Sequence, residues 1–178
     1  MNHSTKEHLT WIYQRLRVIH CENPFIDYML KLKSIINDEG GDMEKYVCGF
    51  LFDKNMEHVL LIEKDHPEWQ KGNFNGVGGK LQPHEIPQDA MTRELKEETG
   101  IDFVNWRMFS VLTDEEKYIV YFFTGMTDNI HQTQQIESEK PVVFTYDDLP
   151  NNILPNLNWL IPMAMDESIW KSKITTIQ

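Results

Sequence analysis

Apolar residues recur at spacings of three and four near the start of the chain, a period that predicts amphipathic helices. The first stripe contains Leu9, Ile12, Leu16 and Ile19. Asn23 followed by Pro24 has the pattern of a helix start, and a second apolar stripe comes after it. The polar, glycine-containing run at 37–43 then interrupts the pattern. These observations predict a helical hairpin over residues 8–36, followed by a linker.

From residue 45 onward the pattern changes to short apolar runs between polar turns, which predicts β-strands. The expected strands cover residues 46–52, 58–62, 106–112, 118–124 and 142–145. A helix is expected from Pro87 to Thr99, because proline suits the first helical turn and Gly100 can end the helix in the left-handed conformation. A further apolar helix is expected from about 157 to 170, bent or begun afresh at Pro162.

This change of pattern predicts an N-terminal helical extension and linker over residues 1–43 and an α+β domain over 44–178. The chain carries 17 Lys and Arg against 28 Asp and Glu, a formal charge of −11, which excludes a basic nucleic-acid-binding domain. No apolar run approaches the roughly 20 residues of a membrane-spanning helix, and the start carries no apolar signal core. We therefore expect a cytoplasmic protein that binds neither membranes nor, stably, nucleic acid.

The chemistry is concentrated in the expected helix at 87–99. At about 100° per residue, Glu94, Glu97 and Glu98 fall within an arc of roughly 100°, and Arg93 can pair with Glu97 one turn on. Three ionised carboxylates so close repel one another and raise each other's pKa unless a cation lies among them. Mg²⁺ or Mn²⁺ suits such oxygen ligands. The alternative is a solvated acidic helix face with no ligand.

A longer pattern surrounds these glutamates. Gly79, five residues, Glu85, seven residues, and then Arg-Glu-aliphatic-any-Glu-Glu-any-Gly-aliphatic from Arg93 to Ile101 fill every defined position of the Nudix hydrolase signature. The chain therefore resembles Nudix hydrolases over roughly residues 45–168. The resemblance implies a Nudix-type α/β/α sandwich with a mixed sheet, here with the helical hairpin added at the N-terminus.

The resemblance also implies roles for individual residues. The carbonyl of Gly78 and the carboxylates of Glu94, Glu97 and Glu98 are the expected Mg²⁺ ligands, with Mn²⁺ as a substitute metal. Glu85 and Arg93 are expected to fix the loop and the helix.

A loop before a late strand supplies a base or an extra ligand in MutT-like members of the family. The similar loop here is 134–139. Glu139 is the preferred candidate for the general base, Glu137 is second, and Glu98 is a rival.

Three residues are expected at the substrate. The stretch 73–80 is similar to the one before the signature in diphosphatases of oxidised purine nucleoside triphosphates, where an Asn in the place of Asn75 contacts the base. Asn156 is a second candidate for base contact, and Lys80 is a candidate for the phosphates. Each has a simpler alternative, since Asn75 can form a turn before glycine, Asn156 can cap a helix, and Lys80 can face solvent.

The expected activity is Mg²⁺-dependent hydrolysis of a nucleoside triphosphate to the monophosphate and pyrophosphate, with an oxidised or non-standard purine deoxynucleotide as the leading substrate. The alternative is cleavage of ADP-ribose, NADH or a dinucleoside polyphosphate by the same metal cluster. A nucleotide-binding module without activity is a third reading. The N-terminal helices are expected to pack on the domain and to contribute to a homodimer.

Overall fold

The computed structural model describes residues 43–114, 117–170 and 174–177. The chain divides into residues 1–39 and 40–178, and everything described below belongs to the second unit. The helical hairpin predicted at 8–36 lies outside the described residues. In the part that is described, no helix has the length and apolar character needed to cross a membrane.

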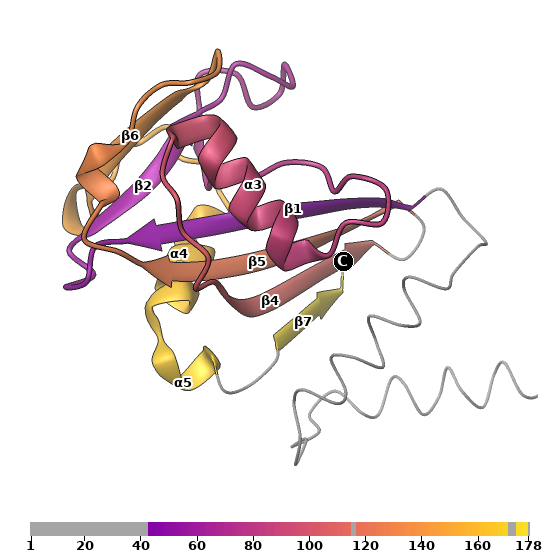
Figure 1. Cartoon of the computed structure of the whole chain (residues 1–178). Helices are drawn as coiled ribbons and strands as arrows, with labels where there is room; N and C mark the ends of the chain where they lie inside the picture. Colours follow the sequence, from indigo (N-terminus) through magenta and orange to yellow (C-terminus); the bar gives the residue numbers. More distant parts are fainter. Residues whose placement is uncertain (1–42, 115–116, 171–173, 178) are drawn as a thin grey trace, which may run out of the picture. The chain divides into compact units, whose positions relative to one another are not determined.

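A mixed sheet forms the centre of the described unit (Figure 1). Its strands are β1 (Glu44–Phe52), β2 (His58–Glu63), β3 (Phe74–Asn75), β4 (Arg107–Asp114), β5 (Tyr118–Met126), β6 (Lys140–Thr145) and β7 (Ile174–Ile177). Within the described residues the strand order is β3-β2-β1-β5-β4-β7, and β6 pairs with β2. β1 runs parallel to β5, whereas β2 is antiparallel to β1, β3 and β6.

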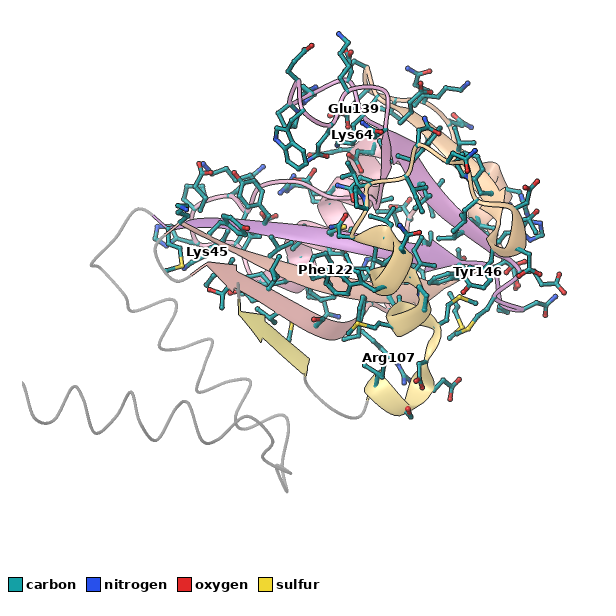
Figure 2. All side chains as sticks on the ribbon, turned by 180° about the vertical axis from the view of Figure 1, so that it is seen from behind. Lys45, Lys64, Arg107, Phe122, Glu139 and Tyr146 are labelled. Atoms are coloured by element: carbon teal, nitrogen blue, oxygen red, sulfur yellow. The ribbon has the colours of Figure 1, made fainter. Side chains whose placement is uncertain are left out.

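Helices lie on both faces of this sheet, α3 on one and α4 with α5 on the other (Figures 1 and 2). The helix α3 (Pro87–Thr99) starts at its proline, and Gly100 ends it with a φ of 74°, as predicted. Met91 and Leu95 are fully buried and attach α3 to the sheet. The main apolar core lies on the opposite face, where α4 packs against β-strand residues such as Phe50 and Phe122.

The last part of the chain differs from the prediction. The helix expected from about 157 to 170 is divided into α4 (Leu157–Met165) and α5 (Glu167–Trp170) by Asp166, which has an extended backbone. Pro162 lies inside α4, so the proline is not where the helix divides. The short strands β3 and β7 were also not predicted, and two short 3₁₀ turns flank β6, at Ile130–Gln132 and Tyr146–Asp148.

Candidate active site

The glycine loop before α3 is fixed to β1 by backbone hydrogen bonds. The N–H of Val47 donates to the Gly79 carbonyl at 2.9 Å, and the N–H of Gly49 donates to the Val77 carbonyl at 2.7 Å. Gly78, between them, has a φ of 154°, and a Cβ there would lie 2.1 Å from the Val47 carbonyl oxygen. Only glycine fits this position, which lets the loop lie directly against β1.

The glutamates of α3 meet this loop at different depths. Glu98 is 4% exposed, and its Oε2 accepts a hydrogen bond from the Gly78 N–H at 3.1 Å. The Glu94 carboxylate lies so close to the Gly79 backbone that a Cβ on Gly79 would be 2.6 Å from it. The side chain of Glu97 is 45% exposed. The predicted common face therefore contains one buried, one partly buried and one about half-exposed carboxylate.

Arg93 connects the loop before α3 with α3 itself. Its guanidinium donates to both carboxylate oxygens of Glu85, at 2.8 and 2.9 Å. The same group contacts Glu94 and Glu97, each at 2.8 Å, and thereby forms the pair with Glu97 predicted from the helical spacing. The carbonyl of Lys80 accepts a further bond at 3.3 Å. Arg93 thus joins the loop to α3 and separates two of its carboxylates.

Glu139 reaches the same region from the chain segment before β6. It is 5% exposed and forms an ion pair with Lys64, which directly follows β2 (Figure 2). The Lys64 Nζ also lies 3.7 Å from the Oε1 of Glu98. Backbone N–H groups of Asp65 and His66 donate to the Oε1 of Glu139, at 3.1 and 3.4 Å. The structure therefore brings together Glu98 and Glu139, whereas Glu137, the second candidate for the base, is exposed.

Burial dominates the electrostatics of this group. It raises the pKa of Glu98 to about 8, although Lys64 and the Gly78 N–H act in the opposite direction. Burial also raises the pKa of Glu94, and the neighbouring charges of Glu97 and Glu137 add to this increase, whereas Arg93 opposes it. Without a cation, these carboxylates are costly to ionise. A cation bound beside them would stabilise their ionised forms.

The donor set fits a hard divalent cation. Glu94, Glu98 and Glu139 offer carboxylate oxygens, and the Gly78 peptide lies beside Glu98. The oxygen chemistry of these donors favours Mg²⁺ or Mn²⁺ over zinc. The absence of a Cβ at Gly79 leaves the space that the Glu94 carboxylate occupies.

The expected substrate residues lie in three different settings. The Oδ1 of Asn75 accepts the Gly76 N–H at 2.8 Å, and its Nδ2 donates to the Gln70 side chain at 3.2 Å. Asn156 occupies the position before α4, but its side chain makes no capping hydrogen bond. The Lys80 Nζ pairs with Glu44, and the Lys80 side chain is 58% exposed.

β3 brings the two asparagine-bearing segments together. The N–H of Phe74 donates to the Asn152 carbonyl and the N–H of Leu154 donates to the Phe74 carbonyl, both at 2.9 Å. Asn75 follows Phe74, and Asn156 comes two residues after Leu154. The two asparagines therefore belong to adjoining segments, which the separation of 81 positions in sequence (156 − 75) does not reveal.

Sequence reasoning missed the contacts of Lys64 and Gln70. Lys64 and Glu139 are 75 positions apart, so only the pairing of β2 with β6 reveals the contact between them. Gln70 lies in a loop without regular periodicity, and its contact with Asn75 had no sequence signal. Beneath Asn75 lies the buried thiol of Cys48, whose pKa is raised to about 12 by burial.

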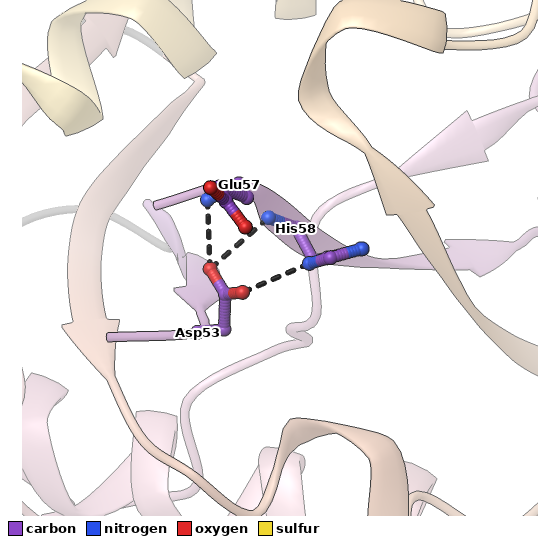
Figure 3. A group of neighbouring side chains, drawn as sticks. All are labelled: Asp53, Glu57 and His58. Carbon is purple, nitrogen blue, oxygen red and sulfur yellow. Dashed lines mark hydrogen bonds and ion pairs between the residues drawn. The ribbon is translucent and has the colours of Figure 1, made fainter. Parts of the chain in front are cut away.

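Within the described residues, Asp53, Glu57 and His58 in the turn between β1 and β2 form a cluster whose potential ligand atoms lie within 4.8 Å of one another (Figure 3). In the same part of the chain, no three carboxylates among those of α3 and Glu139 lie so close. The Asp53 carboxylate accepts the N–H groups of Glu57 and His58 and contacts the His58 ring at 2.8 Å. These hydrogen bonds stabilise the turn, and they explain why the three side chains lie together. The cluster lies at the start of β2, whereas Lys64 follows the end of β2, a distance of roughly 20 Å along a strand.

Comparison with known proteins identifies the family of the domain that contains the glycine loop and α3. The sequence matches the family described as NUDIX domain over residues 44–163. The chain belongs to the NUDIX domain family. A NUDIX relative in Bacillus subtilis strain 168, the putative 8-oxo-dGTP diphosphatase YtkD, is 30% identical over 115 residues, which are 59% of this chain and 71% of the relative.

Other NUDIX relatives match shorter stretches. The oxidized purine nucleoside triphosphate hydrolase of Mus musculus is 29% identical over 103 residues, 54% of this chain and 65% of the relative. The NAD-capped RNA hydrolase NudC of Vibrio vulnificus strain CMCP6 is 31% identical over 64 residues, 36% of this chain. The chain thus spans 24% of NudC and 65% of the mouse protein.

The fold is similar to that of solved NUDIX structures. One structure, from a study of MutT from Aliivibrio salmonicida and Vibrio cholerae, has a TM-score of 0.57 at 22% identity. It covers 69% of this chain, and 97% of its own chain is matched. The expected mixed-sheet sandwich is therefore confirmed for the NUDIX domain.

Proposed function

We propose that the chain is a divalent-metal-dependent hydrolase that cleaves a nucleoside triphosphate to the monophosphate and pyrophosphate. The observation that supports this most directly is the convergence of Glu98 and Glu139 on one site. Both are buried, they come from different elements, and they share a single ammonium group. A stability role alone does not explain this arrangement, because burying two carboxylates with one lysine costs desolvation energy that an apolar pair would avoid.

The ligands proposed for the metal are the Gly78 carbonyl, Glu94, Glu97 and Glu98. Mg²⁺ bound there would neutralise phosphate charge and orient a water molecule for attack on phosphorus. Arg93 acts on the ligands and not on the substrate, since its guanidinium fixes Glu94 and Glu97 relative to Glu85. In this scheme Arg93 is a positioning residue.

Glu139 is the proposed general base. It would take the proton of the attacking water while pyrophosphate leaves with the electron pair of the broken phosphoanhydride bond. Backbone N–H groups of Asp65 and His66 hold one of its oxygens, which keeps the other directed at the site. Glu98 remains the rival. If Glu139 is the base, Glu139→Gln loses turnover even where metal saturates the site, whereas a base at Glu98 would leave Glu139→Gln active at saturating metal.

An oxidised or otherwise non-standard purine is the leading candidate for the base. Asn75 and Asn156 support it, because they lie on adjoining segments and an amide offers both a donor and an acceptor to a purine edge. The mouse and Bacillus subtilis relatives carry names that refer to oxidised purine substrates. Lys80 is proposed to contact phosphate after leaving Glu44.

The test is a panel of 8-oxo-dGTP, dGTP, ADP-ribose, NADH and a dinucleoside polyphosphate, each with Mg²⁺, scored by the products formed. Release of pyrophosphate and a nucleoside monophosphate supports the proposal. Two phosphomonoesters support the alternative, cleavage of ADP-ribose, NADH or dinucleoside polyphosphates, which is favoured by the similarity to a hydrolase of NAD-capped RNA. Binding without any product supports the third reading, a non-catalytic nucleotide-binding module.

A matched pair of variants tests the site within that assay. We predict that Glu98→Gln lowers kcat/KM by at least about 100-fold, since it removes a proposed ligand while keeping the shape of the side chain. Glu57→Gln, the same change in the other cluster, should leave kcat/KM within about twofold, since Glu57 is exposed in the β1–β2 turn. Equal activity of Glu98→Gln and wild type would refute the proposed metal site.

A further inference from the structure

Lys64 holds an unusual position for a lysine. Its side chain is 12% exposed, and the side chains of Glu98 and Glu139 beside it are each 5% exposed. Lysine is almost never buried unless it is paired. Here one ammonium faces two buried carboxylates, so the three groups together carry net negative charge when all are ionised.

The oxygen atoms of the two carboxylates are divided between two kinds of partner. The Oε2 of Glu98 accepts the Gly78 N–H, and the Oε1 of Glu139 accepts backbone N–H groups of Asp65 and His66 and lies 3.5 Å from the Nδ1 of the His66 ring. The remaining oxygens, Oε1 of Glu98 and Oε2 of Glu139, both face the Lys64 Nζ. The two oxygens that the backbone leaves available to a metal ion are therefore the two that Lys64 contacts.

We propose that Lys64 is the internal counter-ion of the metal-free site and that it competes with the divalent cation for Glu98 and Glu139. This inference rests on the proposed function, since it concerns the same carboxylates. In the metal-free chain the ammonium pairs with Glu139 and lies 3.7 Å from the Oε1 of Glu98. When the cation binds, the ammonium leaves them, because two cations at one pair of oxygens repel each other.

The proposal makes an unusual prediction for a residue in an active site, namely that removing it strengthens metal binding. Lys64→Met keeps the length and apolar part of the side chain and deletes the charge. Without a competing ammonium, the affinity for metal should rise by at least about tenfold. Lys64→Arg keeps the charge and should bind metal within about threefold of wild type.

The experiment titrates the full chain with Mn²⁺ alone, by electron paramagnetic resonance of the free ion, without nucleotide. Lys71→Met is the matched control, since Lys71 pairs with Asp65 and its side chain is 55% exposed. It should leave affinity unchanged. Tighter binding by Lys64→Met and not by the control supports the proposal, whereas equal or weaker binding overturns it. If wild type binds no Mn²⁺, the metal site of the proposed function fails. If wild type binds Mn²⁺ and Lys64→Met binds it no more tightly, only the role proposed for Lys64 fails.

A second measurement uses the unaltered chain and does not depend on the folding of a variant. Lysines are acetylated briefly with and without saturating Mg²⁺, and the modification of Lys64 is compared with that of Lys71 by mass spectrometry. In the metal-free chain the contacts with Glu98 and Glu139 protect Lys64. Mg²⁺ should increase its relative modification at least about threefold. An unchanged or reduced value overturns the proposal.

Discussion

The carboxyl group of Glu98 has lost most of its contact with water, which changes its acidity. Burial raises its pKa from an ordinary value of 4.5 to about 8. The folded chain therefore holds this proton more tightly than the unfolded chain does, and folding stability depends on pH through this residue.

We predict that the metal-free protein loses stability as pH rises between about 4.5 and about 8. Below this window Glu98 is protonated in both states and its contribution is fully present, whereas above it the contribution is gone. Thermal unfolding in the presence of a chelator should show the Tm of wild type falling across this window relative to Glu98→Gln, whose amide does not titrate. Parallel curves for the two proteins would contradict the raised pKa.

The two adjacent glycines of the loop are expected to affect different properties, Gly78 the stability of the fold and Gly79 the binding of metal. Gly79→Ala would put a methyl group 2.6 Å from the Glu94 carboxylate, which is the end of a flexible side chain, whereas Gly78→Ala would put one 2.1 Å from the backbone oxygen of Val47. We predict that Gly79→Ala weakens Mn²⁺ binding about tenfold with little change in Tm. Gly78→Ala should lower Tm by many degrees, since the backbone must move. Similar Tm values for the two variants would refute this distinction.

At the scale of elements, Arg93 attaches α3 to the loop before it through the bidentate contact with Glu85. We predict that Arg93→Lys lowers the free energy of unfolding by about 1.5–3 kcal/mol, because a lysine cannot reproduce a bidentate bond. Chemical denaturation measures it. As a control, Lys54→Met breaks an exposed pair with Asp128 and should cost less than about 1 kcal/mol. Equal losses in the two variants would show that Arg93 has no special structural role.

The elements differ in how well the sequence predicts them, and the reason is locality. The bounds of α3 follow from Pro87 and Gly100, which act on the backbone of their own turn. β7 pairs with β4 in parallel, so its existence depends on a partner more than 60 positions earlier (Ser110 with Ile174). β3 has two residues and shows no alternation of its own.

The features of the candidate site also differ in how well the sequence predicts them, and again the local ones are predicted better. Helical spacing predicted the pairing of Arg93 with Glu97 and the position of the glutamates on α3, because this spacing is fixed within a few residues. It could not predict that Glu98 would be buried and Glu97 about half-exposed, since this depends on how α3 is rotated against the sheet. The contact of Lys64 with Glu139 likewise depends on the sheet topology.

Over the whole molecule, the residues of the proposed site come from the glycine loop, α3 and the segment before β6. A cation that binds them in the folded state and not in the unfolded state must stabilise the fold. At about 100 times its Kd, Mg²⁺ should add about 2.7 kcal/mol, a rise in Tm of roughly 5–10 °C for a chain of this size. Differential scanning calorimetry at constant ionic strength measures it. If Glu98→Gln kept the full shift, the cation would be binding elsewhere.

The antiparallel ladder between β2 and β6 determines one further property of the chain. Its last pair is Glu63 with Lys140, so the next step of the same register sets Lys64 opposite Glu139. Successive residues of a strand point to opposite faces, and inserting a single residue into either strand would turn one of these side chains to the wrong side. The lengths of β2 and β6 are thus as strictly constrained as the spacing of the glutamates on α3. Unlike that spacing, this constraint is not part of the sequence signature.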